Sequence, residues 1–138
     1  MVGFGEAVGL FYKNYFNFNG RATRAEYWWP ALMQLLIYSV LIIGFIVTAG
    51  LESDVWIGIL VVIALIFAFG NLIPNYAVAA RRFHDLDQTG WLVLVFVVAN
   101  GLIGLTWFAQ MVWFAMPGTV GNNQYGPDPF GSKADIFI

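Results

Sequence analysis

The sequence predicts an all-α integral membrane protein, in which an amphipathic interfacial helix precedes three transmembrane segments and the third is broken near Asn100-Gly101. Two observations support this fold class. Three long stretches contain no charged residue, namely Tyr27–Gly50, Val55–Ala80 and Trp91–Met116. A charge in hydrocarbon costs on the order of 3 kcal/mol, and about 20 apolar residues span a bilayer. The chain is also 60% hydrophobic and 10% charged, whereas about a quarter of a soluble domain is charged.

Length and composition exclude several classes of protein. A chain of 138 residues is expected to hold one domain, without room for a soluble catalytic domain beside the membrane part. The net charge of −2 argues against a nucleic-acid partner. The absence of cysteine excludes disulfides, thiolate metal sites and a cysteine nucleophile. The first apolar run starts too late and is too long for a signal peptide, so it is expected to remain as an anchor.

Residues 1–22 are predicted to form the interfacial helix and a link to the first span. Apolar side chains in this region recur on one helical face, at Phe4, Val8, Phe11, Tyr15 and Phe18. Such a helix can lie flat at the level of the lipid headgroups, or it can pack this face against the protein's own helices. The sequence favours both alternatives equally.

The first span is predicted over residues 23–50 and the second over residues 55–85. Thr23 and Glu26 match a capping box, which places the first helical residue at Arg24. The aromatic residues that follow belong at the membrane interface. Residues 50–54 form a tight turn to the second span. Inside that span Pro74 lacks an N–H and so frees the carbonyl group of Gly70.

The third segment, predicted over residues 89–116, leaves two alternatives open. Its charge-free stretch would form a helix of roughly 39 Å, at about 1.5 Å per residue, which is long for one span and short for two. Either one kinked helix crosses the membrane, or two half-length helices form a re-entrant hairpin that protein or a wet cavity must cover. The tail, residues 117–138, is rich in Gly, Pro and Asn and is predicted to be an ordered loop that caps one end of the helices.

Orientation follows from the positive charges. Basic residues precede the first span and follow the second, and the turn between these spans has none. Since basic loops stay in the cytoplasm, the N-terminus is expected there and the turn outside. The tail is expected outside if the third segment crosses the membrane once, and in the cytoplasm if it forms a hairpin.

Three polar motifs resemble those of a known family. They are FNGRATRAEYWW (Phe18–Trp29), RRFHDLDQTGW (Arg81–Trp91) and PGTVGNNQYGPDP (Pro117–Pro129). Together they resemble the YhaH-like small bacterial inner-membrane proteins, a family defined by a domain of unknown function. The resemblance covers nearly the whole chain. It implies a helical protein of the bacterial inner membrane and no established activity. Gln88 and Gln124 depart from the pattern, which usually has basic residues there, so a role that needs those two charges is not carried over.

The densest polar cluster is predicted where the first span begins and the second ends. It contains seven charged or titratable residues: Arg21, Arg24, Glu26, Arg81, Arg82, His84 and Asp85. Helical spacing allows Asp85 to pair with Arg81 or Arg82. One hypothesis is a network that clamps the first two spans. Another is that Arg81 and Arg82 bind an anionic headgroup or phosphate, and the simplest is charge that only sets the topology.

No catalytic, metal or cofactor site is predicted. His84 is the only histidine, whereas metal catalysis needs several such ligands. Asp85 lies beside it, but no nucleophile completes a catalytic set. The polar residues inside the spans, Asn71, Asn75, Asn100 and Gln110, are interpreted first as contacts between helices and second as a path for a polar substrate or ion.

The sequence therefore favours a non-enzymatic accessory or scaffolding subunit. Its partners would be membrane lipids and a larger membrane complex or further copies of the chain, without nucleic acid. Two alternatives stay open, a small oligomeric transporter or channel and a module that binds anionic lipid.

Overall fold

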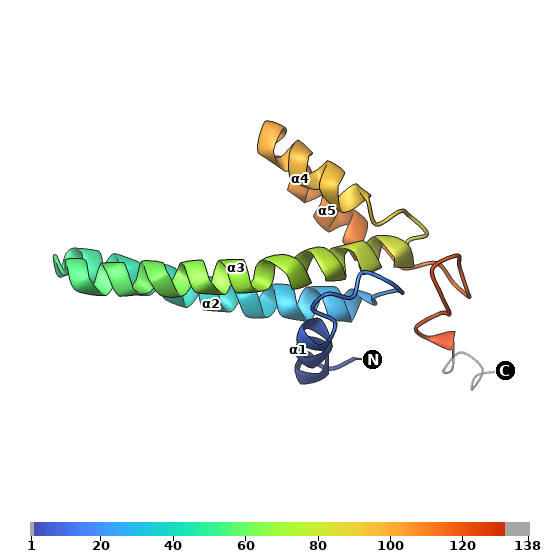
Figure 1. The fold of residues 1–138 in the computed structure, drawn as a ribbon, viewed down its shortest axis with the longest axis horizontal. Coiled ribbons are helices and arrows are strands. Elements are labelled where there is room, and N and C mark those ends of the chain that lie inside the picture. Colours follow the sequence, from blue (N-terminus) through green and yellow to red (C-terminus); the bar gives the residue numbers. More distant parts are fainter. Residues whose placement is uncertain (1, 132–138) are drawn as a thin grey trace.

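The computed structural model describes residues 2–131, and these residues form helices joined by turns and loops (Figure 1). In chain order the helices are α1 (Phe4–Lys13), α2 (Arg24–Gly50), α3 (Asp54–Asp85), α4 (Leu92–Ile103) and α5 (Thr106–Ala115). The two long helices, α2 and α3, form an antiparallel hairpin, and α4 and α5 form a shorter hairpin that leans away from α3 (Figure 1). The helical prediction is confirmed for this part of the chain.

Two of these helices are long and apolar enough to cross a membrane. α2 has 27 residues and a mean hydropathy of 2.3 in its most apolar window, and α3 has 32 residues and a mean hydropathy of 2.6. Only 6% of each window is buried inside the protein. A soluble protein buries its apolar helices, so this exposure points to lipid as the surrounding medium.

The predicted capping box starts α2. The Thr23 hydroxyl accepts a hydrogen bond from the backbone N–H of Glu26 at 3.3 Å, and the Glu26 carboxylate accepts one from the N–H of Thr23 at 3.3 Å. Two of the unpaired donors at the start of the helix are thereby satisfied. The helix begins at Arg24, as predicted.

The third apolar stretch is a hairpin of two short helices, not one continuous helix. The break comes at Gly104, three residues after the Asn100-Gly101 pair near which it was predicted, and that pair lies inside α4. Gly104 has a φ of 73°, which glycine adopts without the steric cost that a side chain brings. α4 has 12 residues, or roughly 18 Å at about 1.5 Å per residue, against a hydrocarbon core of about 30 Å.

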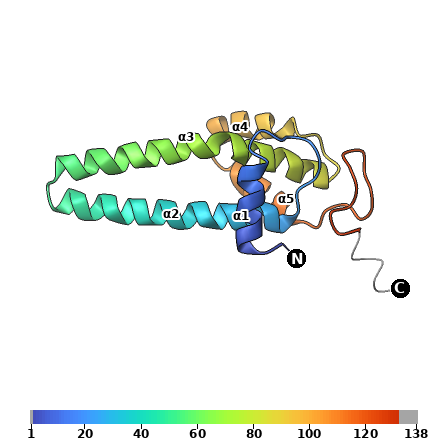
Figure 2. The same ribbon diagram turned by 60° about the horizontal axis from the view of Figure 1, so that its bottom comes forward.

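α1 packs one face against the long hairpin: it lies beside α2 in Figure 1 and crosses the hairpin in Figure 2. Ala7 and Phe11 are buried, and Phe11 contacts Ala22 and Val78. Of the two predicted positions for this helix, packing on the protein is the one with observed contacts. The helix ends at Lys13, so the prediction that the helical face continues to Tyr15 and Phe18 is wrong.

Tyr15 has a different role, which completes the helix that carries Pro74. Its hydroxyl donates a hydrogen bond to the Gly70 carbonyl at 2.7 Å. This is the carbonyl that Pro74 cannot satisfy, because proline lacks the N–H that would reach four residues back. The link after α1 therefore supplies the missing donor of α3.

The buried core lies at one end of the molecule. Ala79, Ala80 and Phe83 of α3 meet Val93 of α4 and Phe114 of α5 there. The Phe83 and Phe114 rings pack edge to face with their centroids 4.6 Å apart, an arrangement that aromatic pairs favour. The described part of the tail, residues 117–131, continues past this end of α3 (Figure 2). Residues 132–138 of the predicted tail lie outside the described residues.

Candidate functional site

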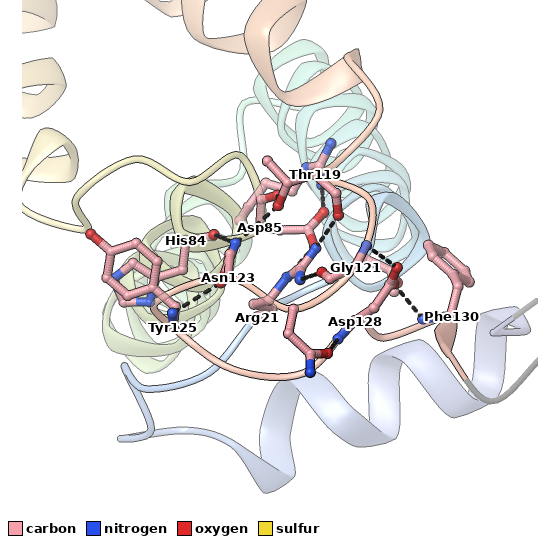
Figure 3. A network of polar contacts seen from close by, with 12 residues as sticks. Arg21, His84, Asp85, Thr119, Gly121, Asn123, Tyr125, Asp128 and Phe130 are labelled. Carbon is pink, nitrogen blue, oxygen red and sulfur yellow. Dashed lines mark hydrogen bonds and ion pairs between the residues drawn. The ribbon is translucent and has the colours of Figure 1, made fainter. Parts of the chain in front are cut away.

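The candidate site is a polar network around Asp85, the last residue of α3 (Figure 3). Asp85 is 2% exposed. Its carboxylate pairs with Arg21 at 2.9 Å and with Arg82 at hydrogen-bonding distance. The two guanidinium groups are also buried, with side-chain exposures of 1% and 0%. Buried charges of this kind are stable only if they are paired and hydrogen-bonded.

Arg82 ties the end of α3 to the end of α5. Its Nε donates to the Phe114 carbonyl at 3.1 Å, and Nη2 donates to the Met116 carbonyl. Its Nη1 donates to Asp85. These carbonyls lie in the last turn of α5 and just after it, where four carbonyl groups lack partners within the helix. Arg82 thus caps the returning hairpin, and each of its three nitrogens donates to the protein itself.

Arg21 ties the link before α2 to the tail. Its Nε donates to Asp85 at 2.9 Å, while Nη1 and Nη2 donate to the carbonyls of Gly121 and Thr119 at 2.6 Å each. The guanidinium fork suits this arrangement because it presents donors in several fixed directions. Its three nitrogens are all engaged.

The tail packs directly on the end of α3. Thr119 donates to the backbone carbonyl of Asp85 through its N–H at 2.8 Å and through its hydroxyl at 3.1 Å. Asn123 donates to the carbonyl of His84 at 2.8 Å. A Cβ built on Gly118 would overlap the Asp85 carboxylate. Glycine at this position therefore permits the close approach of the tail backbone.

A carboxylate also holds the tail to itself. Asp128 accepts backbone hydrogen bonds from Phe130 and Gly121, at 2.8 Å each. These two N–H groups hold the pKa of Asp128 below its usual range. Gly121 has a φ of 81°, a conformation that favours glycine. The predicted ordered cap is present as far as residue 131.

His84 stacks against the tail. Its ring lies parallel to the Tyr125 ring, with 4.0 Å between the centroids and 5° between the planes. Its Nδ1 is 3.0 Å from the carbonyl oxygen of Gly20. A carbonyl only accepts, so Nδ1 carries the proton and Nε2 of the neutral ring is an acceptor. The histidine is thereby fixed between the link and the tail.

Arg81 is held less firmly than its neighbour. Nη1 lies 3.7 Å from the Glu26 carboxylate, and Nε has no hydrogen-bond partner among residues 2–131. The Arg81 carbonyl accepts from the N–H of Ala22 at 3.0 Å. Arg24, by contrast, is exposed and reaches only the Ala115 carbonyl, at 3.4 Å.

Arg21, Arg82 and Asp85 thus form one buried network, and Arg81 pairs with Glu26. Arg24 and His84 instead reach backbone carbonyls of α5 and the link. The donors of the predicted cluster therefore point at carboxylates and carbonyls of α2, α3, α5, the link and the tail, which is the geometry of a clamp. Binding of an anionic headgroup by Arg82 has no support, because that side chain is fully buried and fully engaged. Among residues 2–131 no cluster of three or more His, Cys, Asp or Glu side chains could hold a metal ion.

The polar residues inside the apolar helices find separate partners. Gln34 of α2 and Asn75 of α3 exchange two side-chain hydrogen bonds of 2.9 Å. The Asn71 amide oxygen accepts from the Tyr12 hydroxyl at 2.9 Å, and Asn100 accepts from Thr106. Three of the four predicted intramembrane positions thus link one helix to another, as expected of polar side chains in hydrocarbon.

Gln110, the fourth position, lines a lateral groove. The groove has a volume of about 870 Å³ and lies between the long hairpin and the α4–α5 hairpin. Besides Gln110, its lining includes Gln34, Asn75 and Asn100, set among apolar and aromatic side chains. A second pocket, of about 660 Å³, lies beside His84.

Several contributors to the site carried no signal of their own in the sequence. Tyr15 was predicted as part of an apolar face, Tyr12 was not singled out, and Thr119 and Asn123 were predicted only as loop residues. Gln124, one of the two departures from the family pattern, lies 3.4 Å from the Asp87 carboxylate. The signal that was available is that the tail motif accompanies the two arginine motifs, which indicates that all three meet.

Comparison with known proteins identifies the family. Residues 15–127 match the family described as "Protein of unknown function (DUF805)". The chain is 36% identical to the inner membrane protein YhaI of Escherichia coli K12, over 88% of this chain and 93% of that protein. It is 38% identical to the inner membrane protein YhaH of the same organism, over 85% of this chain and 90% of that protein. No solved structure matches. The matched region contains the whole arginine–aspartate clamp, and the chain belongs to the DUF805 family.

Proposed function

We propose that the protein is a non-enzymatic accessory or scaffolding subunit of the bacterial inner membrane, which packs laterally against a larger membrane complex or against further copies of itself. The observation that carries this proposal is the lateral groove between the two hairpins. It is open to the surroundings along apolar helices, yet amide side chains line it. In hydrocarbon such groups are satisfied by polar groups of neighbouring helices. Gln34, Asn75 and Asn100 already bond within the chain, so Gln110 is the amide that a partner helix would meet in the groove.

The clamp supports an assembly role over a chemical one. Asp85, Arg21 and Arg82 are consumed in holding segments together. The Gln34–Asn75 pair is likewise closed on itself, which favours helix contact over a path for a polar substrate. What the clamp achieves is to fix the α4–α5 hairpin at an angle to α3, and this angle creates the groove.

Lateral packing is tested with a groove-filling variant. Ala31 of α2 lines the groove, and Ala31→Trp would fill it. Native purification in mild detergent, followed by mass spectrometry of co-purifying chains, is expected to recover a partner chain or an oligomer with the parent protein and to lose it with this variant. Ala49→Trp is the matched control, on the same helix, at an exposed position near the turn. A monomer without partners from the parent protein would contradict the proposal.

The proposed orientation places the clamp at the cytoplasmic face. Four arginines gather at the end of the hairpin where α2 begins and α3 ends, and basic segments stay in the cytoplasm. The chain has no native cysteine, so single-cysteine variants report accessibility cleanly. A membrane-impermeant maleimide is expected to label Ser53→Cys in intact spheroplasts and Val120→Cys only after permeabilisation. The reverse pattern would place the clamp outside.

A further inference from the structure

The second pocket, beside His84, is elongated along α3. It has a volume of about 660 Å³ and lies between α3 and the start of α4, within the range of pockets that hold small molecules. One wall is a stripe of α3 made by Ile73, Tyr76, Ala80 and His84. From Ile73 to His84 this stripe runs for roughly 16 Å, at about 1.5 Å per residue. The pocket is therefore a groove along the helix that starts at the clamp.

The lining changes from polar to apolar along this groove. Asn19, His84 and Thr89 lie at the end near the clamp, where the link and the tail close the pocket, whereas Ile73 and Leu94 lie deeper along the helices. The exposed aromatic ring of Trp91 stands at the polar end, as aromatic side chains do at membrane interfaces. A groove with this gradient suits a molecule that has a polar head and an apolar tail.

His84 offers a hydrogen-bond acceptor to this groove. Its Nδ1 donates to Gly20, which leaves Nε2 as the acceptor. Gly90 lies next to Nε2, and a Cβ at this position would be only 2.8 Å from that nitrogen. Glycine thus keeps open the space in front of Nε2, while the stack on Tyr125 holds the ring in place.

The distribution of charged residues around the pocket restricts the kind of polar headgroup that it can bind. Among residues 2–131 no Lys, Arg, Asp or Glu lines the pocket, and Arg21 and Arg82 are engaged in the clamp. A net anionic head would therefore find no counter-charge. An ammonium group finds the acceptor Nε2 and the aromatic rings of Phe18 and Trp91, whose faces attract cations. The amide of Asn19 and the hydroxyl of Thr89 supply donors for a phosphate whose negative charge is balanced by the ammonium group of the same head.

We propose that this groove binds one zwitterionic membrane phospholipid whose head ends in a primary ammonium group, with the head at His84 and one acyl chain along α3 toward Ile73. This goes beyond the proposed assembly function and does not depend on it, because the site is formed within one chain. It is a different cavity from the lateral groove, with which it shares the lining residues Tyr76 and Val93. The bound lipid would contact the link between α1 and α2, together with α3, α4 and the tail.

The test uses the full-length protein in nanodiscs that contain equal amounts of phosphatidylethanolamine and phosphatidylcholine with the same acyl chains. Phosphatidylcholine has the same phosphate but no N–H donor, so it isolates the contribution of the head. Native mass spectrometry is expected to show one retained phosphatidylethanolamine at roughly tenfold preference, the size expected of one hydrogen bond to a charged group. Equal retention of the two lipids would overturn the proposed head recognition.

Two blocking variants locate the site. Ile73→Trp and Leu94→Trp fill the deep part of the groove without touching the clamp, and each is expected to lose the retained lipid. Ile66→Trp is the matched control, an exposed isoleucine two turns earlier on α3, and is expected to keep it. The melting temperature of each variant in detergent reports on folding. Unchanged lipid retention in both folded blocking variants would overturn the site.

The role of Nε2 is tested separately with His84→Phe. The phenyl ring can stack on Tyr125 but offers no acceptor. The total amount of retained lipid is expected to stay near one, while the preference for phosphatidylethanolamine over phosphatidylcholine falls to about one. A structural role alone would reduce retention of both lipids equally, and an unchanged preference would remove Nε2 from the site.

Discussion

At the turn between α2 and α3 the long hairpin consists of two helices that leave most of their surface exposed, whereas at the other end the link, α5 and the tail all converge on it (Figure 1). Near the turn, a Cβ at Gly44 would lie at an ordinary van der Waals distance of 3.4 Å from the Leu60 side chain, and Val55 is 73% exposed. At the clamp, Arg82 is 0% exposed. At the turn end, lipid surrounds the helices in place of a protein core. At the clamp end, the protein itself must provide the partners of the buried charges.

The largest loss of stability is expected from a substitution of Asp85, at the clamp end. Asp85→Asn keeps the shape of the side chain but removes the charge that two buried guanidinium groups share. Removing one partner of a buried ion pair costs about 3–5 kcal/mol. We expect a loss of this size in the free energy of unfolding, measured by denaturant titration in detergent. Asp54→Asn, the exposed aspartate at the turn end, is expected to change it by less than about 0.5 kcal/mol; equal effects would refute the contrast.

The second largest effect is expected from Arg82→Lys. Lysine carries the charge but cannot reach Asp85, Phe114 and Met116 at once, because it lacks the planar fork of donors. A loss of about 2–3 kcal/mol follows from the hydrogen bonds to charged groups that are broken. Arg81→Lys serves as the neighbouring control and is expected to cost less than about 1 kcal/mol, since Arg81 has one ion pair of 3.7 Å and an unpartnered Nε among the described residues. The same denaturant titration measures both costs. A larger cost for Arg81→Lys than for Arg82→Lys would contradict the assignment of Arg82 as the more firmly held side chain.

Two glycines sharpen the comparison because their substitution is expected to have opposite signs. Gly118→Ala pushes a methyl group into the Asp85 carboxylate, and overpacking of this kind costs about 1–3 kcal/mol. Gly58→Ala, in α3 near the turn, meets nothing within 4 Å and is expected to stabilise the helix by up to about 1 kcal/mol. Thermal unfolding of both variants tests this. Destabilisation by both would mean that the turn end is as tightly packed as the clamp.

The smallest effect is expected for the amide pair between the two ends. A double-mutant cycle of Gln34→Leu and Asn75→Leu is expected to give a coupling energy of about 0.6 kcal/mol, typical of hydrogen bonds between membrane helices. A second cycle of Gln34→Leu and Asn71→Leu is expected to give about zero, because Asn71 bonds to Tyr12. Equal coupling in both cycles would show that the observed pair is not the one that matters.

The sequence predicted those parts of the fold that depend on side-chain type. The two long helices follow from charge-free runs, the start of α2 follows from the Thr23–Glu26 capping box, and the unsatisfied Gly70 carbonyl follows from Pro74. The sequence did not predict which donor reaches that carbonyl, because Tyr15 looked like one more residue of an apolar face.

The clamp was only partly predictable for a similar reason. Asp85 and its arginines are conspicuous, but four of the six side-chain hydrogen bonds of Arg21 and Arg82 go to backbone carbonyls, of Phe114, Met116, Thr119 and Gly121. Every residue has a carbonyl group, so no residue type marks the ones that are used. The turn at Gly104 was misplaced because three small or polar residues compete within five positions, and only the tertiary fold selects one.

The position of Thr119 and Gly121 in the chain has a consequence for biogenesis. Arg21 is made early and Asp85 much later, but the two carbonyls that complete the coordination of Arg21 are among the last parts of the described chain to leave the ribosome. The two long helices must therefore enter the membrane with an arginine still hydrated at its surface, and closure waits for the end of translation. A chain that ends before this segment would keep both long helices. It would leave Arg21 without two of its hydrogen-bond partners and so present an incompletely folded site to quality-control proteases.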